Sequence, residues 1–164
     1  MSKKCCRGGG NKINNVIKTT LVGLAALGIF VLVFALSEKN SDGGSGLVQG
    51  SNNVVTIPLA QLNNGKAHFF RYSSGERDIQ FFVLRSSDGV IRAAFDTCDV
   101  CYPEKKGYRQ EGDFMVCNNC NNKFRSTNIN VLKGGCNPVP LDRTVVGNNL
   151  VIKVADIKKG EFYF

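Results

Sequence analysis

Residues 78–96 read DIQFFVLRSSDGVIRAAFD and carry the clearest secondary-structure signal in the chain. Both ends of this stretch are rich in β-branched and aromatic residues, which favour strands. Between them, Ser87-Asp88-Gly89 contains the Asp-Gly pair that suits a type I′ turn. We therefore expect two antiparallel strands joined by a tight hairpin.

Short segments of the same character recur on both sides of this hairpin. They are separated by turns rich in Asn, Ser and Gly, and no helical period longer than one or two turns appears among them. These segments are VVTIPL (54–59), AHFFRY (67–72), DFMVC (113–117), INVL (129–132) and LVIKVADI (150–157). The sequence thus predicts a mainly β fold, a small antiparallel domain of hairpins over residues 54–164.

Residues 19–36 read TTLVGLAALGIFVLVFAL and contain no charged residue. As a helix this segment is about 27 Å long at 1.5 Å per residue, which matches the hydrocarbon core of a lipid bilayer. We prefer to interpret it as a single transmembrane signal anchor. The alternative is a cleaved secretory signal, because the chain has a basic start and Val33-Phe34-Ala35 resembles a loose cleavage site. The apolar run is longer than a typical signal core, which argues against cleavage.

Charge is unevenly distributed along the chain, which has 21 Lys+Arg against 13 Asp+Glu and a net charge of +8. Five of the positive charges precede the apolar segment, with no acid among them: Lys3, Lys4, Arg7, Lys12 and Lys18. The rest is nearly balanced, so the charge does not indicate nucleic-acid binding. The positive-inside rule places residues 1–18 in the cytoplasm and the remainder across the cell membrane.

A Ser-, Gly- and Asn-rich stretch, SEKNSDGGSGLVQGSNN, follows the apolar segment at residues 37–53. This composition is typical of a flexible linker. The expected organisation is therefore a basic cytoplasmic N-terminus (1–18), a transmembrane anchor (19–36), a linker (37–53) and a cysteine-rich, metal-binding β domain (54–164).

Four cysteines in two CxxC motifs are the most specific chemical signal. Cys98-x2-Cys101 is followed, after fifteen residues, by Cys117-x2-Cys120. Each CxxC turn holds two sulfurs close enough to share one metal, and two such turns complete four ligands, as in zinc ribbons and many iron-sulfur sites. The alternatives are two disulfides or a redox-active dithiol. A thioredoxin-like dithiol is disfavoured because neither motif lies between an apolar parallel strand and a helix.

The remaining cysteines and the single histidine have weaker signals. Cys136, within GGCNPVPL, is a candidate fifth sulfur at the site or a resolving thiol, and equally a small buried residue. His68 lies in an alternating strand, where we expect an ordinary surface or hydrogen-bonded residue rather than a metal ligand. Cys5 and Cys6 precede the apolar segment, so we expect reduced thiols there, with acylation as the alternative.

Four motifs, in order, resemble the FtrD-like membrane iron-sulfur family. They are AFDTCDVCY (94–102), KGYRQEGD (106–113), MVCNNC (115–120) and KGGCNPVPL (133–141), and the likeness extends over residues 54–164 to the aromatic end, EFYF. The resemblance implies a membrane protein with an iron-sulfur type site that passes electrons to a membrane iron-transport or redox partner. Larger relatives have many spans, whereas this chain has one predicted span.

A weaker, architectural likeness is to Rieske domains, in which two ligand loops precede a Gly- and Pro-rich third loop. Here cysteines replace the Rieske histidines, so four thiolates on a [2Fe-2S] centre would give a lower potential, nearer that of plant-type ferredoxins. Export of an unfolded chain is an objection to a cluster assembled inside the cell. Zinc bound after export, or oxidation of the thiols to disulfides, avoids this objection.

The loop between the two CxxC motifs contains Tyr102, Lys105, Lys106, Tyr108 and Arg109. We interpret it as a solvated charged loop, and the alternative is a docking surface for a redox partner or an anionic chelate. Three functions stay open: an electron carrier in iron handling, an interaction module with structural zinc, and a thiol-disulfide protein. The sequence has no hydrolase, kinase or dinucleotide-binding signature, so we expect an electron-transfer or metal-binding protein rather than a hydrolase or transferase.

Overall fold

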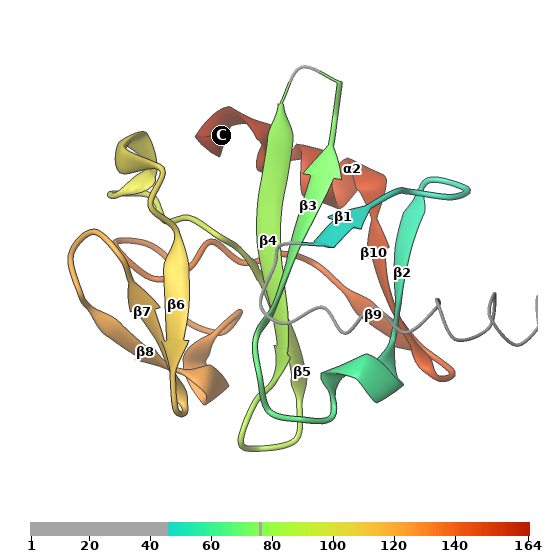
Figure 1. The fold of residues 1–164 in the computed structure, drawn as a ribbon, viewed down its shortest axis with the longest axis horizontal. Helices are drawn as coiled ribbons and strands as arrows, with labels where there is room; N and C mark the ends of the chain where they lie inside the picture. Colours follow the sequence, from blue (N-terminus) through green and yellow to red (C-terminus); the bar gives the residue numbers. More distant parts are fainter. Residues whose placement is uncertain (1–45, 76) are drawn as a thin grey trace, which may run out of the picture. The chain divides into compact units, whose positions relative to one another are not determined.

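Strands dominate the part of the chain that the structure, a computed structural model, describes: residues 46–75 and 77–164 (Figure 1). The strands of these residues form three sheets. Each sheet contains at least one strand from a segment that the sequence predicts as a strand. The predicted mainly β domain is therefore confirmed.

The central sheet has the strand order β1-β3-β4-β5. Its strands are β1 (Gly46–Val48), β3 (His68–Ser73), β4 (Asp78–Arg85) and β5 (Ile91–Phe95). The pairs β3–β4 and β4–β5 are antiparallel, whereas β1 runs parallel to β3. Successive side chains of β4 face opposite sides: Phe81 lies in one hydrophobic core and Phe82 in the other, and both are fully buried. The central sheet is thus covered on both faces.

The hairpin between β4 and β5 is confirmed, but its turn is not type I′. Gly89 has φ +81°, whereas Asp88 has a negative φ. The Ser86 carbonyl accepts a hydrogen bond from the Gly89 N–H at 2.8 Å, and the Ser86 N–H donates to the Val90 carbonyl at 2.9 Å. The two hydrogen bonds define a type I turn followed by a glycine bulge. The turn-type prediction was wrong because the loop contains three residues rather than two.

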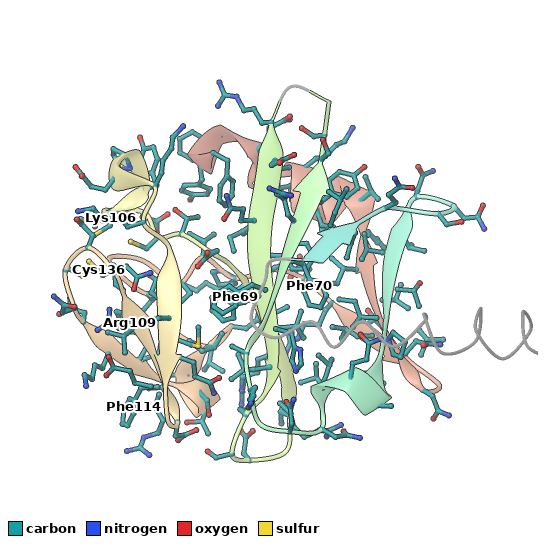
Figure 2. All side chains as sticks on the ribbon, in the orientation of Figure 1. Phe69, Phe70, Lys106, Arg109, Phe114 and Cys136 are labelled. Atoms are coloured by element: carbon teal, nitrogen blue, oxygen red, sulfur yellow. The ribbon has the colours of Figure 1, made fainter. Side chains whose placement is uncertain are left out.

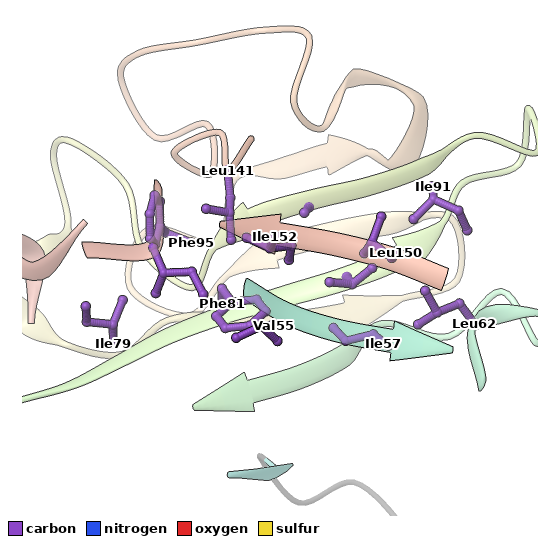
Figure 3. Close-up of a cluster of buried hydrophobic side chains, with 13 residues drawn as sticks. Val55, Ile57, Leu62, Ile79, Phe81, Ile91, Phe95, Leu141, Leu150 and Ile152 are labelled. Carbon is purple, nitrogen blue, oxygen red and sulfur yellow. The ribbon is translucent and has the colours of Figure 1, made fainter. Parts of the chain in front are cut away.

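The second sheet has the order β2-β10-β9, with β2 Val54–Pro58, β10 Asn149–Lys153 and β9 Thr144–Val146. Its apolar side chains meet those of β4 and β5 in the larger core (Figure 3). Members of this core include Val55 and Ile57 from β2, Ile79 and Phe81 from β4, and Leu150 and Ile152 from β10. The alternation of apolar residues along β2 and β10 explains why one face of this sheet is buried.

The third sheet has the order β6-β7-β8, with β6 Tyr108–Glu111, β7 Phe114–Cys117 and β8 Lys123–Arg125. It lies on the opposite side of the central sheet from β2, β9 and β10 (Figure 1). A second core joins it to the central sheet and contains Phe82, Leu84, Ala94, Tyr108, Met115 and Ile129, together with Cys98 and Cys117. Two of the cysteines are therefore core residues as well as candidate ligands.

Two predicted strands differ from the structure. INVL (129–132) is not a strand: Asn130 has φ +64°, and the Val131 and Leu132 N–H groups both donate to the Asn128 carbonyl. Side-chain hydrogen bonds from Asn130 to the Ala93 and Leu141 carbonyls hold this turn. LVIKVADI is a strand only to Lys153 and continues as the helix α2 (Val154–Lys158). Short 3-10 turns complete the fold: η1 Leu59–Leu62, η2 Tyr102–Glu104, η3 Ser126–Asn128 and η4 Glu161–Tyr163.

The predicted anchor and most of the predicted linker lie outside the described residues. Within the range 37–53, β1 pairs with β3, and Asn52 and Asn53, both with positive φ, connect β1 to β2. The β structure therefore begins before Val54. No helix among the described residues is long and apolar enough to cross a membrane, and the segment 19–36 is not among them.

Candidate metal centre

The first CxxC motif occupies the loop after β5, and backbone hydrogen bonds fix its position. The Asp96 N–H donates to the Gln80 carbonyl, and the Val139 N–H donates to the Thr97 carbonyl at 3.0 Å. Inside the motif, the Cys101 N–H points at the Cys98 sulfur, 3.1 Å away. An N–H aimed at sulfur stabilises a thiolate. This contact fixes the position of the Cys98 sulfur within the loop.

The second CxxC motif closes the turn between β7 and β8. Cys117 ends β7, and its carbonyl accepts a hydrogen bond from the Asn121 N–H at 2.9 Å. Asn121 has φ +59°, a conformation that Asn tolerates better than most residues. Cys117 is buried, whereas Cys120 is exposed. The turn thus presents one sulfur to the core and one toward the surface.

The structure brings the sulfurs of both motifs and of Cys136 together. Cys98, Cys101 and Cys136 form one group and Cys101, Cys117 and Cys120 another, and within each group the sulfurs lie within 4.8 Å of one another. Cys101 belongs to both groups, and its sulfur is 3.9 Å from that of Cys136. All five are free thiols in the structure. Soft thiolate donors in this number suit zinc, copper(I) or iron-sulfur clusters, so the residues present fit such a group.

Cys136 reaches the cluster on a loop with two glycines in the left-handed region, Gly134 (φ +83°) and Gly135 (φ +61°). The Tyr108 hydroxyl donates to the Cys136 carbonyl at 2.6 Å and ties this loop to β6. Figure 2 labels Cys136 beside the third sheet. The structure thus places the Cys136 thiol beside the Cys101 thiol, and its role as a ligand or resolving thiol stays a prediction.

The pKa values of three of the thiols shift, and not in one direction. Burial and the Cys120 thiol raise the pKa of Cys136, whereas at Cys120 burial is outweighed by the Asn122 N–H and neighbouring thiols, which lower the pKa of Cys120. A hydrogen bond with Asn119 lowers the pKa of Cys101, but burial and the Cys117 thiol outweigh it and raise that pKa to about 12. Burial, followed by the Cys98 thiol, raises the pKa of Tyr108 well above its usual range. A bound metal cation favours the thiolate form of each cysteine that it binds.

Asp96 and Gly107 form the wall next to the first motif. The Asp96 Oδ1 accepts a hydrogen bond from the Tyr108 N–H at 2.7 Å, and burial raises the pKa of Asp96 to about 6. Gly107 has φ +62°, and a Cβ at this position would lie 2.5 Å from the Asp96 Oδ2. Glycine is required here for both reasons. Neither residue was a candidate from the sequence, since no local pattern brings 96 and 107 together.

The other predicted residues lie apart from the thiols or serve different roles. The His68 Nε2 forms a hydrogen bond with the Asn64 Oδ1 at 3.0 Å, and His68 is in neither thiol group. Tyr108, predicted to lie in the solvated loop, is instead buried on β6. Lys106 and Arg109 are exposed, and each forms a hydrogen bond with an Asn side chain, Asn119 and Asn118 respectively. Cys5 and Cys6 lie outside the described residues.

Fold and site together define a small, mainly β domain with a thiol cluster of the kind that binds metal. The family model described as membrane iron-sulfur containing protein FtrD-like matches residues 62–164. The chain therefore belongs to this family, and its predicted membership is confirmed. No curated protein matches the chain, and no solved structure matches it.

Proposed function

We propose that the protein is a membrane-anchored iron-sulfur protein that transfers electrons, in association with iron uptake. Cys98, Cys101, Cys117 and Cys120 are the proposed ligands, with Cys136 beside them. The observation that carries the proposal is the convergence of the five sulfurs in two overlapping groups. Membership of an iron-sulfur family supports the choice of metal.

The burial of the thiols suits electron transfer. Cys98 and Cys117 anchor the site in the core, whereas the exposed Cys120 brings one edge of it to the surface. Two exposed apolar side chains lie near the first motif: Val100, within it, is 61% exposed, and Phe162, which packs against Tyr102, is 62% exposed. When bound, an iron-sulfur cluster supplies a reversible redox centre, and a partner can approach it at this edge. The proposed partner is a membrane iron-transport or redox protein.

We further propose that the site is zinc-ribbon-like or Rieske-like in architecture. Two ligand loops and the Gly- and Pro-rich loop of Cys136 meet at one end of a three-stranded sheet, which supports this likeness. The proposed topology keeps the N-terminus in the cytoplasm, anchors residues 19–36 in the bilayer and places the cysteine domain outside.

Structural zinc is a second candidate function. Cys98 and Cys117 belong to the core that joins the third sheet to the central one, so a closed zinc site there would stabilise the fold directly. In that case the protein would be an interaction module rather than an electron carrier.

Metal and sulfide analysis of the full chain, purified from membranes in detergent, distinguishes these functions. We expect iron with acid-labile sulfide and a visible absorption that dithionite bleaches. Cys117→Ser should remove the absorption, whereas Cys5→Ser, a cysteine in the N-terminal segment, should keep it. Zinc alone, or disulfides with no metal, would overturn the electron-transfer proposal.

A further inference from the structure

A cleft of about 430 Å³ adjoins the cysteine cluster. Its walls come from the start of β4, the loop after β5, the loop before β6 and the C-terminal turn. A smaller cavity lined by Cys98, Cys101 and Cys117 shares wall residues with this cleft, among them Thr97 and Lys106. The cleft volume falls in the range that small-molecule sites occupy. Because Thr97 lines the cleft and directly precedes Cys98 in the sequence, a ligand in the cleft would lie close to the thiols.

Two oxygen atoms on the inner wall form no hydrogen bond with any described residue. Thr97 is only 6% exposed, yet none of the described residues forms a hydrogen bond with its hydroxyl. The Asp96 Oδ1 is satisfied by the Tyr108 N–H, but no hydrogen bond from a described residue reaches its Oδ2. Among the described residues, the only fully buried side-chain polar atom without a partner is the Arg85 Nε, so these two oxygens keep some exposure. Both can accept a hydrogen bond from a ligand in the cleft.

The outer wall carries positive charge. Lys105 forms no ion pair with any described residue, whereas the Lys106 Nζ donates to the Asn119 side chain at 3.0 Å and lies 3.9 Å from the Glu104 carboxylate. Arg77 also lines the cleft and donates to the Phe164 carbonyl. Of the two acids in the lining, Asp78 pairs with Arg71 at 3.3 Å. Of the charged side chains that line the cleft, three are basic and two are acidic.

We propose that this cleft binds a small hydroxycarboxylate anion. The ligand hydroxyl donates to the Asp96 carboxylate next to Thr97, and the ligand carboxylates accept hydrogen bonds from Lys105 and Lys106. A plain polycarboxylate would place like charge against Asp96 with no hydrogen-bond donor to offset it. A ligand that combines an anionic end with a neutral donor satisfies both walls.

The chemistry of the cleft does not depend on which metal the thiols hold. The proposal goes beyond the proposed function and gives the metal centre a neighbouring small-molecule site. Binding is therefore measured directly by calorimetry on the full chain in detergent, with its metal in place. Metal content is measured after each titration, because citrate also removes metal ions from proteins.

The matched ligands are citrate and tricarballylate, which differ only by the hydroxyl. We expect citrate to bind about tenfold more tightly, as one hydrogen bond to a charged group predicts. Thr97→Val should shrink the difference between citrate and tricarballylate.

The charged wall is tested with Lys105→Gln/Lys106→Gln. This double variant should weaken citrate and tricarballylate equally, by about tenfold or more. Lys123→Gln is the control, since Lys123 is an exposed lysine that pairs with Glu111 outside the cleft. Equal affinity for citrate and tricarballylate, no binding of either, or unchanged binding by the lysine double variant would each overturn the proposal. Zinc in place of iron would overturn only the proposed function.

Discussion

Gly107→Ala should destabilise the protein far more than Gly112→Ala, although both glycines have similar backbone conformations. Their φ angles are +62° and +56°, so alanine at either position is held in the left-handed region, at about 1–2 kcal/mol. Around Gly112 no atom would lie within 4 Å of an added Cβ. At Gly107 all three carboxyl atoms of Asp96 would lie within 2.8 Å. The difference between the two variants isolates the clash with this carboxylate.

The clash displaces Asp96 from the Tyr108 N–H, and a hydrogen bond to a charged acceptor contributes about 1.5–3 kcal/mol. The expected totals are therefore about 2.5–5 kcal/mol for Gly107→Ala and about 1–2 kcal/mol for Gly112→Ala. Urea unfolding in detergent, followed by circular dichroism and tyrosine fluorescence, measures both, since the chain has no tryptophan. On an Asp96→Ala background, Gly107→Ala should cost no more than Gly112→Ala. Equal destabilisation of the two single variants would refute the reasoning.

Three further outcomes are expected. Phe82→Leu loses contacts with two aromatic rings, and Phe81→Leu loses contact with one. The expected losses of folding stability are therefore about 1–3 kcal/mol for Phe82→Leu and about 0.5–1.5 kcal/mol for Phe81→Leu. Only Phe82→Leu should weaken metal retention in a chelator titration. Cys101→Ser should lose more metal, by elemental analysis, than Cys120→Ser, because Cys101 belongs to both sulfur groups; equal losses would contradict this. The Ser86 hydroxyl, followed by the Val90 N–H, lowers the pKa of Asp88 to about 2. The contribution of Asp88 to stability is therefore present above about pH 4 and is lost as the pH falls through about 2. Asp88→Asn should remove this part of the acid-unfolding profile, and identical profiles of the variant and the unchanged protein would contradict the prediction.

The alternation of apolar and polar residues predicted most of the strands, because successive side chains of a strand face alternately toward the core and toward solvent. VVTIPL alternates, and in β2 Val55 and Ile57 are buried while Thr56 and Pro58 are exposed. INVL misled because its apolar residues are not on one buried face: Ile129 is buried, but Val131 and Leu132 are largely exposed. The side chain that fixes this turn, Asn130, binds carbonyls far away in sequence. Apolar content alone could not reveal such long-range contacts.

The candidate site was partly predictable for a similar reason. CxxC spacing is a local property of the sequence, and by itself it indicates that Cys98, Cys101, Cys117 and Cys120 are chemically special. Their ligand role stays a prediction. The proximity of Cys136 to Cys101 depends on the tertiary position of the Cys136 loop, which the Tyr108 hydroxyl holds. The spacing of the cysteines in the sequence could not predict this position. The cleft next to the thiols depends in the same way on Asp96 and Gly107, which only the tertiary fold brings together.

β4 is shared by the two cores, and this limits how far the domain can be divided. A fragment of residues 97–137 would contain both CxxC motifs and Cys136, and so resembles a self-sufficient metal-binding peptide. It would lack Phe82, Leu84 and Ala94, which belong to the same buried core as Cys98 and Cys117. Thiol chemistry and β-sheet packing are therefore one inseparable module here. Evolution or engineering can transplant this cysteine site only together with the sheet that supports it.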